Sequence, residues 1–217
     1  MPLTTVARLA VCCGLLGSAA PAARIAAQAT AQSGVPVLRP GAPGQPAAEV
    51  SATAPAPLPH SAADVAFMQG MIGHHQQAVE MVALIADRST WDDLRTLGRR
   101  IAVSQADEIR MMQRWLEARG AEVPSAHAMH MHGATLMPGM LTPDEMARLA
   151  AARGREFDRL WLEGMIKHHG GALTMVKDLF AQPGAAQQGE IFAFASDVEA
   201  DQAMEIDRMR RMLASIR

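Results

Sequence analysis

The sequence predicts an all-α protein: a four-helix bundle made of two repeated helical hairpins, with a short extra helix in the central connection. Helix start and stop signals bound several long segments that carry an apolar stripe. One motif-bearing segment recurs in both halves of the chain. No segment alternates with period two for long enough to predict a strand. The 217 residues, 49% of them hydrophobic, suffice for one domain with a core plus appendages.

The N-terminus has the pattern of a secretory signal peptide, which we expect over residues 1–29. Arg8 supplies the positive start, Leu9 to Leu16 is a short apolar run, and Ala27-Gln28-Ala29 fits a cleavage site, with an earlier cut after Ala20 as an alternative. Both cysteines precede the cut. We therefore expect a periplasmic or secreted protein without disulfides, thiolate metal sites or cysteine nucleophiles.

The rest of the chain divides by composition. Residues 30–59 are rich in Ala and Pro and have no apolar period, so we expect a disordered tether. The bundle domain is expected over residues 60–217. Its first repeat covers about 61–119, a His- and Met-rich loop covers 125–140, and the second repeat covers about 156–216.

Two helices are predicted in the first repeat. Ser61 is the expected N-cap of the first, with Asp64 at the third helical position, and this helix should run to about Asp87. Ser89 or Thr90 is the expected cap of the second helix, which runs to the end of the repeat.

Three further helices are predicted after the loop. Thr142-Pro143-Asp144-Glu145 combines an N-cap, a proline at the first helical position and a capping glutamate, and it predicts the short extra helix. A long helix should follow from about Glu156 to Ala181, where Pro183-Gly184 interrupts the chain. The last helix is expected over roughly 187–216.

The repeat is clearest around two histidine pairs. The first copy contains Gly70-Met71-Ile72 and His74-His75, and the second contains Gly164-Met165-Ile166 and His168-His169. Two antiparallel hairpins, each with one apolar face, bury these faces best against each other, which predicts the bundle.

The histidine pairs are candidate metal ligands. On a helical wheel, His75 lies on the apolar stripe beside Met71, while His74 lies on one edge of the stripe. Adjacent residues diverge by about 100°, so the two rings should not hold one ion in the same way. The alternative is that these residues only pack in the core. The candidate ligands on the helices are Met71, His74, His75, Met81, Met165, His168, His169 and Met175.

Four polar residues fall among the core positions of the second and fourth long helices: Gln105, Glu108, Gln202 and Glu205. A buried carboxylate costs on the order of several kcal/mol unless it is paired. The inward-facing histidines are the nearest candidate partners. Such a pair is either structural or the outer shell of a metal site.

The loop concentrates the same two side-chain types, at His127, Met129, His130, Met131, His132, Met137 and Met140. Thioether sulfur suits Cu(I) and Ag(I), and imidazole suits both copper states. We therefore predict that this loop binds copper.

Several other functions are disfavoured. The net charge is −2 with no basic block, which argues against nucleic acid, and the N-terminal apolar run is too short for a membrane span. We find no Glu-x-x-His, His-Glu-x-x-His, Gly-x-Ser-x-Gly or P-loop pattern. We therefore expect neither an enzyme nor an organic cofactor.

The histidine motifs resemble a known family. The segment Phe67 to Ala78, its second copy around His168-His169, the Met137-Pro138-Gly139-Met140 turn and the Gln-x-x-Glu-Ile pattern resemble the bacterial domain-of-unknown-function family 305. The resemblance covers roughly 60–217. It implies a ferritin-like fold and an exported, CopM-like copper-binding protein whose ligands are the Met and His residues named above. The chain departs from the commonest motif, because Gly73 and Lys167 stand where proline usually precedes the histidine pair.

The sequence thus predicts a protein that buffers or sequesters copper, with Cu(I) favoured over Cu(II) and Ag(I). Copper ions are its expected partners, and a periplasmic copper-handling protein is a candidate partner. Two alternatives remain open at this point. One is a metal-free helical module that binds a partner protein through a bundle locked by buried His and Glu pairs. The other is a metal-dependent oxidase on a ferritin-like scaffold.

Overall fold

The computed structural model describes residues 37–39, 45–50, 59–125 and 136–216, and the chain forms two compact units, Met1–Pro55 and Ala56–Arg217. In the first unit, β1 (Val37–Arg39) pairs antiparallel with β2 (Ala48–Val50). The prediction of no strand is wrong here, because three-residue strands are too short to show a period of two. The predicted signal peptide and most of the predicted tether lie outside the described residues.

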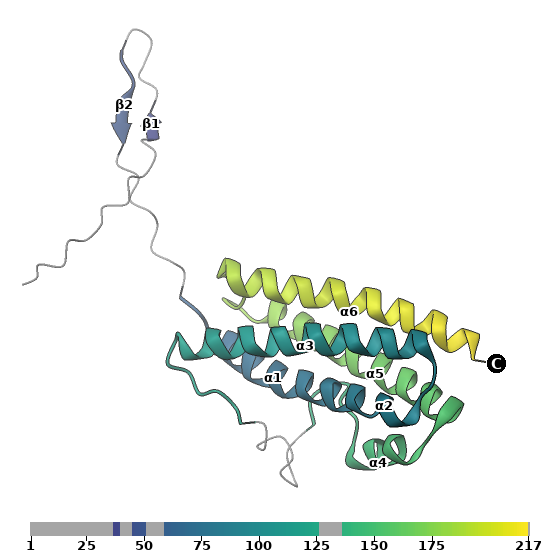
Figure 1. The fold of residues 1–217 in the computed structure, drawn as a ribbon. Helices are drawn as coiled ribbons and strands as arrows, with labels where there is room; N and C mark the ends of the chain where they lie inside the picture. The colour runs from purple at the N-terminus through teal and green to yellow at the C-terminus, as the bar shows by residue number, and fades with distance from the viewer. Residues whose placement is uncertain (1–36, 40–44, 51–58, 126–135, 217) are drawn as a thin grey trace, which may run out of the picture. The chain divides into compact units, whose positions relative to one another are not determined.

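The second unit is a helical bundle (Figure 1). Helix α1 packs against α3, α5 packs against α6, and α1 and α5 pack against each other. This arrangement confirms the predicted all-α fold. None of the helices in the described part of the chain has the length and apolar character that a membrane span requires. The helices are α1 (Ala62–Ala83), α2 (Ile85–Arg88), α3 (Asp92–Glu117), α4 (Pro143–Ala151), α5 (Gly154–Ala181) and α6 (Gly189–Ser215).

The predicted start of α1 is confirmed, and it also ties two distant segments together. Ser61 and Asp64 form a capping box, in which each side chain accepts a hydrogen bond from the backbone N–H of the other. The second carboxylate oxygen of Asp64 accepts a 2.7 Å hydrogen bond from the backbone N–H of Ala186, between α5 and α6. Asp64 is fully buried. The start of α1 is therefore joined to the α5–α6 turn.

We expect Asp64→Ala to lower the free energy of unfolding by about 2–3 kcal/mol, because it removes the carboxylate half of the capping box and leaves the buried N–H of Ala186 without an acceptor. Ser61→Ala removes one capping bond only and should cost about 1 kcal/mol. Urea unfolding of the two variants measures the difference. Equal losses would show that the bond to Ala186 contributes nothing to stability.

The first predicted helix ends earlier than expected. Helix α1 ends at Ala83 instead of Asp87, and α2 continues after Leu84. The carbonyl oxygen of Met81 accepts hydrogen bonds from the N–H of Leu84 and from the indole N–H of Trp161, which lies on α5. A side chain from the other hairpin thus occupies a carbonyl in the last turn of α1.

The cap expected for α3 is also displaced. The helix begins after Trp91, and no side chain caps it. The hydroxyl of Ser89 accepts a hydrogen bond from the backbone N–H of Trp91, so it stabilises the preceding turn. The predicted capping box at Thr142 and Glu145, with Pro143 inside the first turn of α4, is confirmed.

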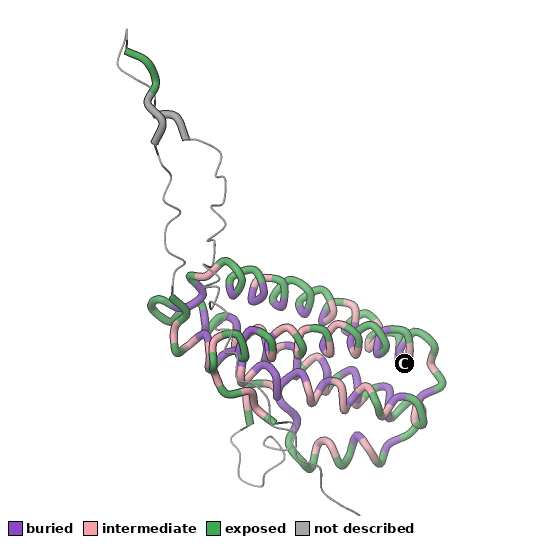
Figure 2. The backbone as a smooth tube through the Cα atoms, turned by 60° about the vertical axis from the view of Figure 1, so that its left-hand side comes forward, coloured by how far each residue is buried: buried purple, intermediate pink, exposed green. Residues whose placement is uncertain are grey.

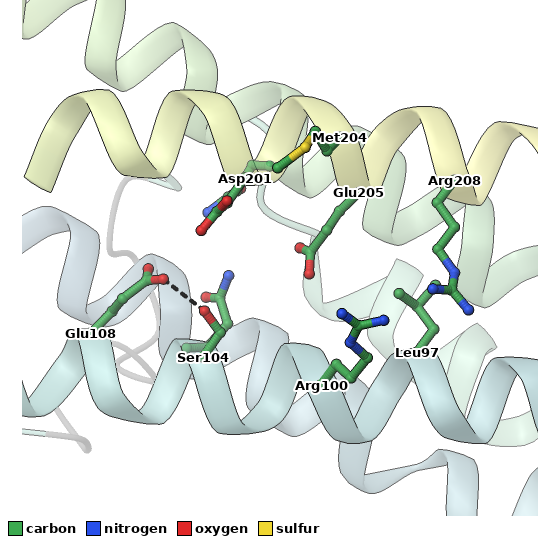
Figure 3. Close-up of a pocket in the computed structure, with 10 residues that line it drawn as sticks. Leu97, Arg100, Ser104, Glu108, Asp201, Met204, Glu205 and Arg208 are labelled. Atoms are coloured by element: carbon green, nitrogen blue, oxygen red, sulfur yellow. Dashed lines mark hydrogen bonds between the residues drawn. The ribbon is translucent and has the colours of Figure 1, made fainter.

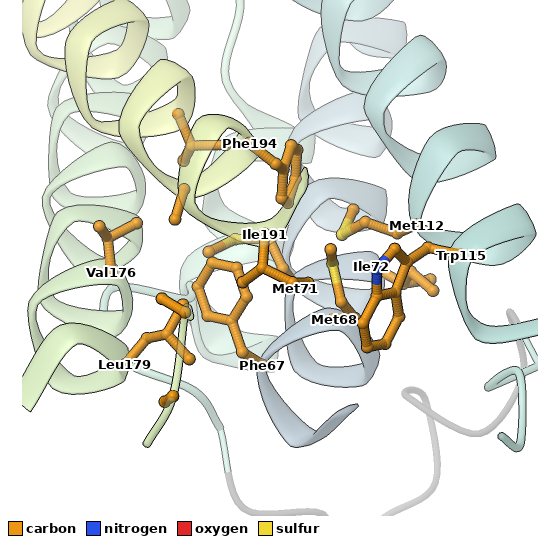
Figure 4. Close-up of a cluster of buried hydrophobic side chains, with 14 of the residues drawn as sticks. Phe67, Met68, Met71, Ile72, Met112, Trp115, Val176, Leu179, Ile191 and Phe194 are labelled. Atoms are coloured by element: carbon orange, nitrogen blue, oxygen red, sulfur yellow. The ribbon is translucent and has the colours of Figure 1, made fainter. Parts of the chain in front are cut away.

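The core consists of two hydrophobic clusters, one toward each end of the bundle. The buried residues line the inner faces of the helices (Figure 2), and Figure 4 shows the first cluster. The first cluster includes Phe67, Met68, Met71, Ile72, Met112, Trp115, Val176, Leu179, Ile191 and Phe194. The second includes Met81, Ile101, Phe157, Trp161, Met165, Ile206 and Met209. Both histidine pairs lie between the two clusters along their helices. The bundle therefore has a buried polar layer at mid-height.

Candidate metal centre

The polar layer contains four histidines, His74 and His75 on α1 and His168 and His169 on α5. All four side chains are fully buried. The helical wheel placed His74 at the edge of the apolar stripe, and the structure shows that this edge is buried as well. The wheel considers one helix at a time, and the segment between Met137 and Leu141 covers this edge of α1.

Two of the histidines are paired with glutamates. The Nε2 atom of His75 lies 2.6 Å from a carboxylate oxygen of Glu108 on α3, and Nε2 of His169 lies 2.7 Å from Glu205 on α6. The glutamate side chains are 22% and 24% exposed, while their histidine partners are buried. The two carboxylates are thus half-buried at the edge of the core, and they have the histidine partners that the sequence suggested.

The Glu108 carboxylate is held ionised by its neighbours. Burial alone would raise its pKa, but the hydrogen bond and the charge interaction with His75 and a 2.9 Å bond from the Ser104 hydroxyl hold the pKa below its usual value. An ionised carboxylate at this distance fixes the orientation of the imidazole ring and raises its basicity as a ligand.

The other two histidines are hydrogen-bonded to backbone carbonyl groups. Nε2 of His74 lies 3.0 Å from the oxygen of Pro138, and Nε2 of His168 lies 2.9 Å from the oxygen of His74. The two rings overlap, with centroids 3.8 Å apart. Burial, followed by the neighbouring His75, lowers the pKa of His74 to about 3, and burial and the other histidines lower the pKa of His168 well below its usual value. Both rings are therefore neutral at neutral pH.

The hydrogen bonds of the four rings leave one nitrogen free on each. A carbonyl oxygen or a carboxylate can only accept, so Nε2 carries the hydrogen in every case. In a neutral ring the Nδ1 atom then presents a lone pair. All four Nδ1 atoms are buried and have no hydrogen-bond partner among the described residues. Unpartnered buried nitrogens are uncommon in native proteins, and a neutral imidazole nitrogen is a common metal ligand.

The predicted methionine ligands fall into two groups. Met71, Met81 and Met165 are fully buried in the hydrophobic clusters. Met175 is half-buried, and it lies over Gly70 of α1 together with Met137 from the loop. A Cβ atom built on Gly70 would lie 3.2 Å from the Met137 sulfur and 3.4 Å from the Met175 methyl group. The absence of a side chain at Gly70 thus lets two thioethers approach the same point of α1.

These two methionines also reach the surface. They line a cavity of about 430 Å³ together with Phe67 and Gly70. Met81 occupies the corresponding place over Gly164, but there its neighbour is Leu141 instead of a second methionine.

The remaining loop residues have different outcomes. Met140 is buried, and its N–H donates to the carbonyl of Met137, which closes a tight turn. His127, Met129, His130, Met131 and His132 lie outside the described residues, so their predicted role stays a prediction. Among the described residues, no group of three or more His, Cys, Asp and Glu side chains is arranged to hold a metal ion.

The family assignment follows from comparison with known proteins. A family model described as a domain of unknown function, DUF305, matches residues 64–213. The chain belongs to the DUF305 family. Comparison of this DUF305 chain with curated proteins finds no match.

Solved structures similar to this DUF305 chain share its bundle. A DUF305 protein from Streptomyces coelicolor is 32% identical with a TM-score of 0.62, covering 71% of this chain and 93% of that chain. A DUF305 fragment from Deinococcus radiodurans is 30% identical with a TM-score of 0.60, covering 72% and 99%. CopM in its Cu(II)-bound form is 28% identical with a TM-score of 0.59, covering 70% and 96%. CopM structures with Cu(I) and with silver are also similar, at 26% identity and a TM-score of 0.56.

Sequence analysis missed the residues that hold the loop turn of this DUF305 chain in place. The Gln77 side chain accepts from the N–H of Leu141 and donates to its carbonyl oxygen, at 2.8 and 2.9 Å. Gly139, at a positive φ of 76°, packs against Gly171 of α5, where a Cβ atom would overlap the Pro138 carbonyl group. The one available signal was Gly170-Gly171 directly after the second histidine pair, since glycine inside a helix often marks a close backbone approach.

Proposed function

We propose that this DUF305 protein is an exported copper-binding protein that buffers or sequesters copper, with Cu(I) favoured over Cu(II) and Ag(I), and without turnover. The observation that carries the proposal is the set of four buried histidine Nδ1 atoms without a partner. The Nε2 atoms are already held by carboxylates or carbonyl groups, as in metal sites whose outer shell orients the ligands. The Cu(I)-, Cu(II)- and silver-bound forms of CopM support copper as the metal.

The thioethers favour the Cu(I) state. Met137 and Met175 meet over Gly70 and line a cavity, so both side chains can be reached without unfolding of the core. Thioether sulfur is a soft ligand that selects Cu(I) and Ag(I). Because no three His, Cys, Asp or Glu side chains converge in the described residues, a soft site here depends on methionine.

An anaerobic titration with Cu(I) against a chromophoric chelator at neutral pH tests the proposal, using the chain from Thr30. We expect tight, saturable withdrawal of copper. Met137→Leu combined with Met175→Leu removes two thioethers with little change in volume and should weaken one Cu(I) site at least tenfold. Met204→Leu is the matched control, because Met204 is 62% exposed on α6 and lies outside the centre.

Two results would contradict the proposal. If the unsubstituted chain leaves all copper with the chelator, Cu(I) binding is excluded and the metal-free partner-binding module becomes the better interpretation. If the double variant and Met204→Leu weaken binding equally, the Met137 and Met175 thioethers do not form a site. Replacing His127, Met129, His130, Met131 and His132 with serine then separates the contribution of the loop.

A further inference from the structure

The two outer helices of the bundle, α3 and α6, face each other across a cavity of about 340 Å³ (Figure 3). Its polar lining includes Ser104, Gln105 and Glu108 from α3 and Asp201, Gln202 and Glu205 from α6. Among the described residues, none of the proposed copper ligands lines this cavity.

One end of the cavity is acidic, and two of its carboxylates are paired only with histidines. Glu108 and Asp201 face each other there, with Glu205 next along α6 (Figure 3). No lysine or arginine in the described part of the chain forms an ion pair with any of the three carboxylates. Partial burial, together with the charges of Glu108, Glu205 and Asp197, raises the pKa of Asp201. A cation at this end would relieve the repulsion.

The floor of the cavity carries polar atoms that have no partner. Gln105 and Gln202 are each only 2% exposed. The side-chain oxygen of Gln105 and both polar atoms of the Gln202 amide make no hydrogen bond within the part of the chain that the structure describes. A buried amide without a partner costs about 1–3 kcal/mol. A ligand with its own hydrogen-bonding shell would satisfy these atoms once the two side chains rotate toward the cavity.

The donor atoms around the acidic end are oxygens from carboxylate, amide and hydroxyl groups, which is the set that hard divalent cations prefer. Within the described ranges, no three carboxylate or histidine side chains converge closely enough to hold a bare ion. A cation that keeps part of its water shell, as Mg²⁺ and its analogue Mn²⁺ do, needs fewer direct ligands. We propose that the α3–α6 cavity binds a hydrated, hard divalent cation of the Mg²⁺ or Mn²⁺ type, at a site separate from the copper ligands.

The opposite end of the cavity provides a test of the ligand's charge. Arg100 and Arg208 line it, and neither forms an ion pair among the described residues (Figure 3). For a simple cation these guanidinium groups are unfavourable, so removing one should tighten binding. For a zwitterionic ligand, such as an amino acid, they would hold the anionic group, and removing one should weaken binding.

The experiment is a titration of the metal-free full chain with MnCl₂, followed by electron paramagnetic resonance of free Mn²⁺ and by paramagnetic broadening of amide NMR signals. We expect saturable binding, displaced by MgCl₂, with broadening centred on residues 104–108 and 201–205. Asp201→Asn should weaken binding about tenfold, and Arg100→Gln should strengthen it severalfold. Met204 lines the same cavity, and Met204→Leu should leave Mn²⁺ affinity unchanged, because a hard cation does not bind thioether sulfur.

Three outcomes would overturn the proposal: no saturable Mn²⁺ binding, binding that Asp201→Asn leaves unchanged, or binding that Arg100→Gln weakens. The copper proposal is tested independently. Met137→Leu with Met175→Leu should leave Mn²⁺ binding intact, and Asp201→Asn should leave Cu(I) withdrawal intact. Failure of one proposal therefore does not imply failure of the other.

Discussion

Gly171→Ala is expected to lower the free energy of unfolding by about 3 kcal/mol. A Cβ atom at this position would overlap the Pro138 carbonyl group and lie 2.6 Å from the Cα of Gly139, so the backbone of the turn has to move away. This movement breaks the hydrogen bond between Nε2 of His74 and the Pro138 oxygen and leaves a buried N–H without an acceptor. Urea or thermal unfolding measures the loss, and the amide signals of residues 137–141 should shift.

The chain provides its own control at the preceding residue. Gly170 lies in the same helix, and a Cβ atom there would meet nothing within 4 Å. Gly170→Ala should therefore raise stability by about 0.5–1 kcal/mol through helix propensity alone. The two neighbouring substitutions should thus act in opposite directions. Equal effects would show that the turn does not pack tightly against α5 in solution.

The metal-free protein should lose stability steadily as the pH falls below about 6.5. The pKa of His74 is lowered to about 3 and that of His168 well below its usual value, so only the unfolded chain takes up these two protons in this range. The contribution of these histidines to the free energy of unfolding is therefore fully present above their pKa in the unfolded chain. It decreases as the pH falls toward their pKa in the folded protein, by up to about 1.4 kcal/mol per pH unit for each histidine. Below the usual carboxyl pKa of 4.5, loss of the ionised Glu108 adds to the decrease.

Urea unfolding at a series of pH values measures this slope. His74→Gln and His168→Gln should each flatten it between pH 6.5 and 4.5, whatever their effect on stability at pH 7. His60→Gln is the control, because His60 is exposed and lies outside the polar layer. An unchanged slope in both test variants would mean that these histidines are protonated in the folded protein, which contradicts their burial.

The bundle and part of its polar layer could be predicted because their signals are local. The capping boxes at Ser61 and Thr142 are read from a few adjacent residues. Glu108 and Glu205 stood out because carboxylates at core positions need a partner, and the buried histidines are that partner. The metal-ligand roles of all these residues stay predictions.

The contacts that position the layer could not be predicted, because they join segments that are distant in the sequence. The burial of His74 depends on the turn at Pro138, and the overlap of His74 with His168 depends on how α1 crosses α5. The break after α1 depends on the indole N–H of Trp161. A pattern within one helix carries no information about which segment will cover it.

The two glycines over which methionines pack have a consequence for how the halves differ. Gly70 and Gly164 occupy equivalent positions in the two repeats. The segment that connects the repeats covers both glycines, with Met137 over Gly70 and Leu141 over Gly164. Two thioethers therefore meet at one glycine and a single thioether at the other. If the protein binds copper as proposed, the two halves are no longer chemically equivalent, and we expect the half with two thioethers to bind Cu(I) first as the copper concentration rises.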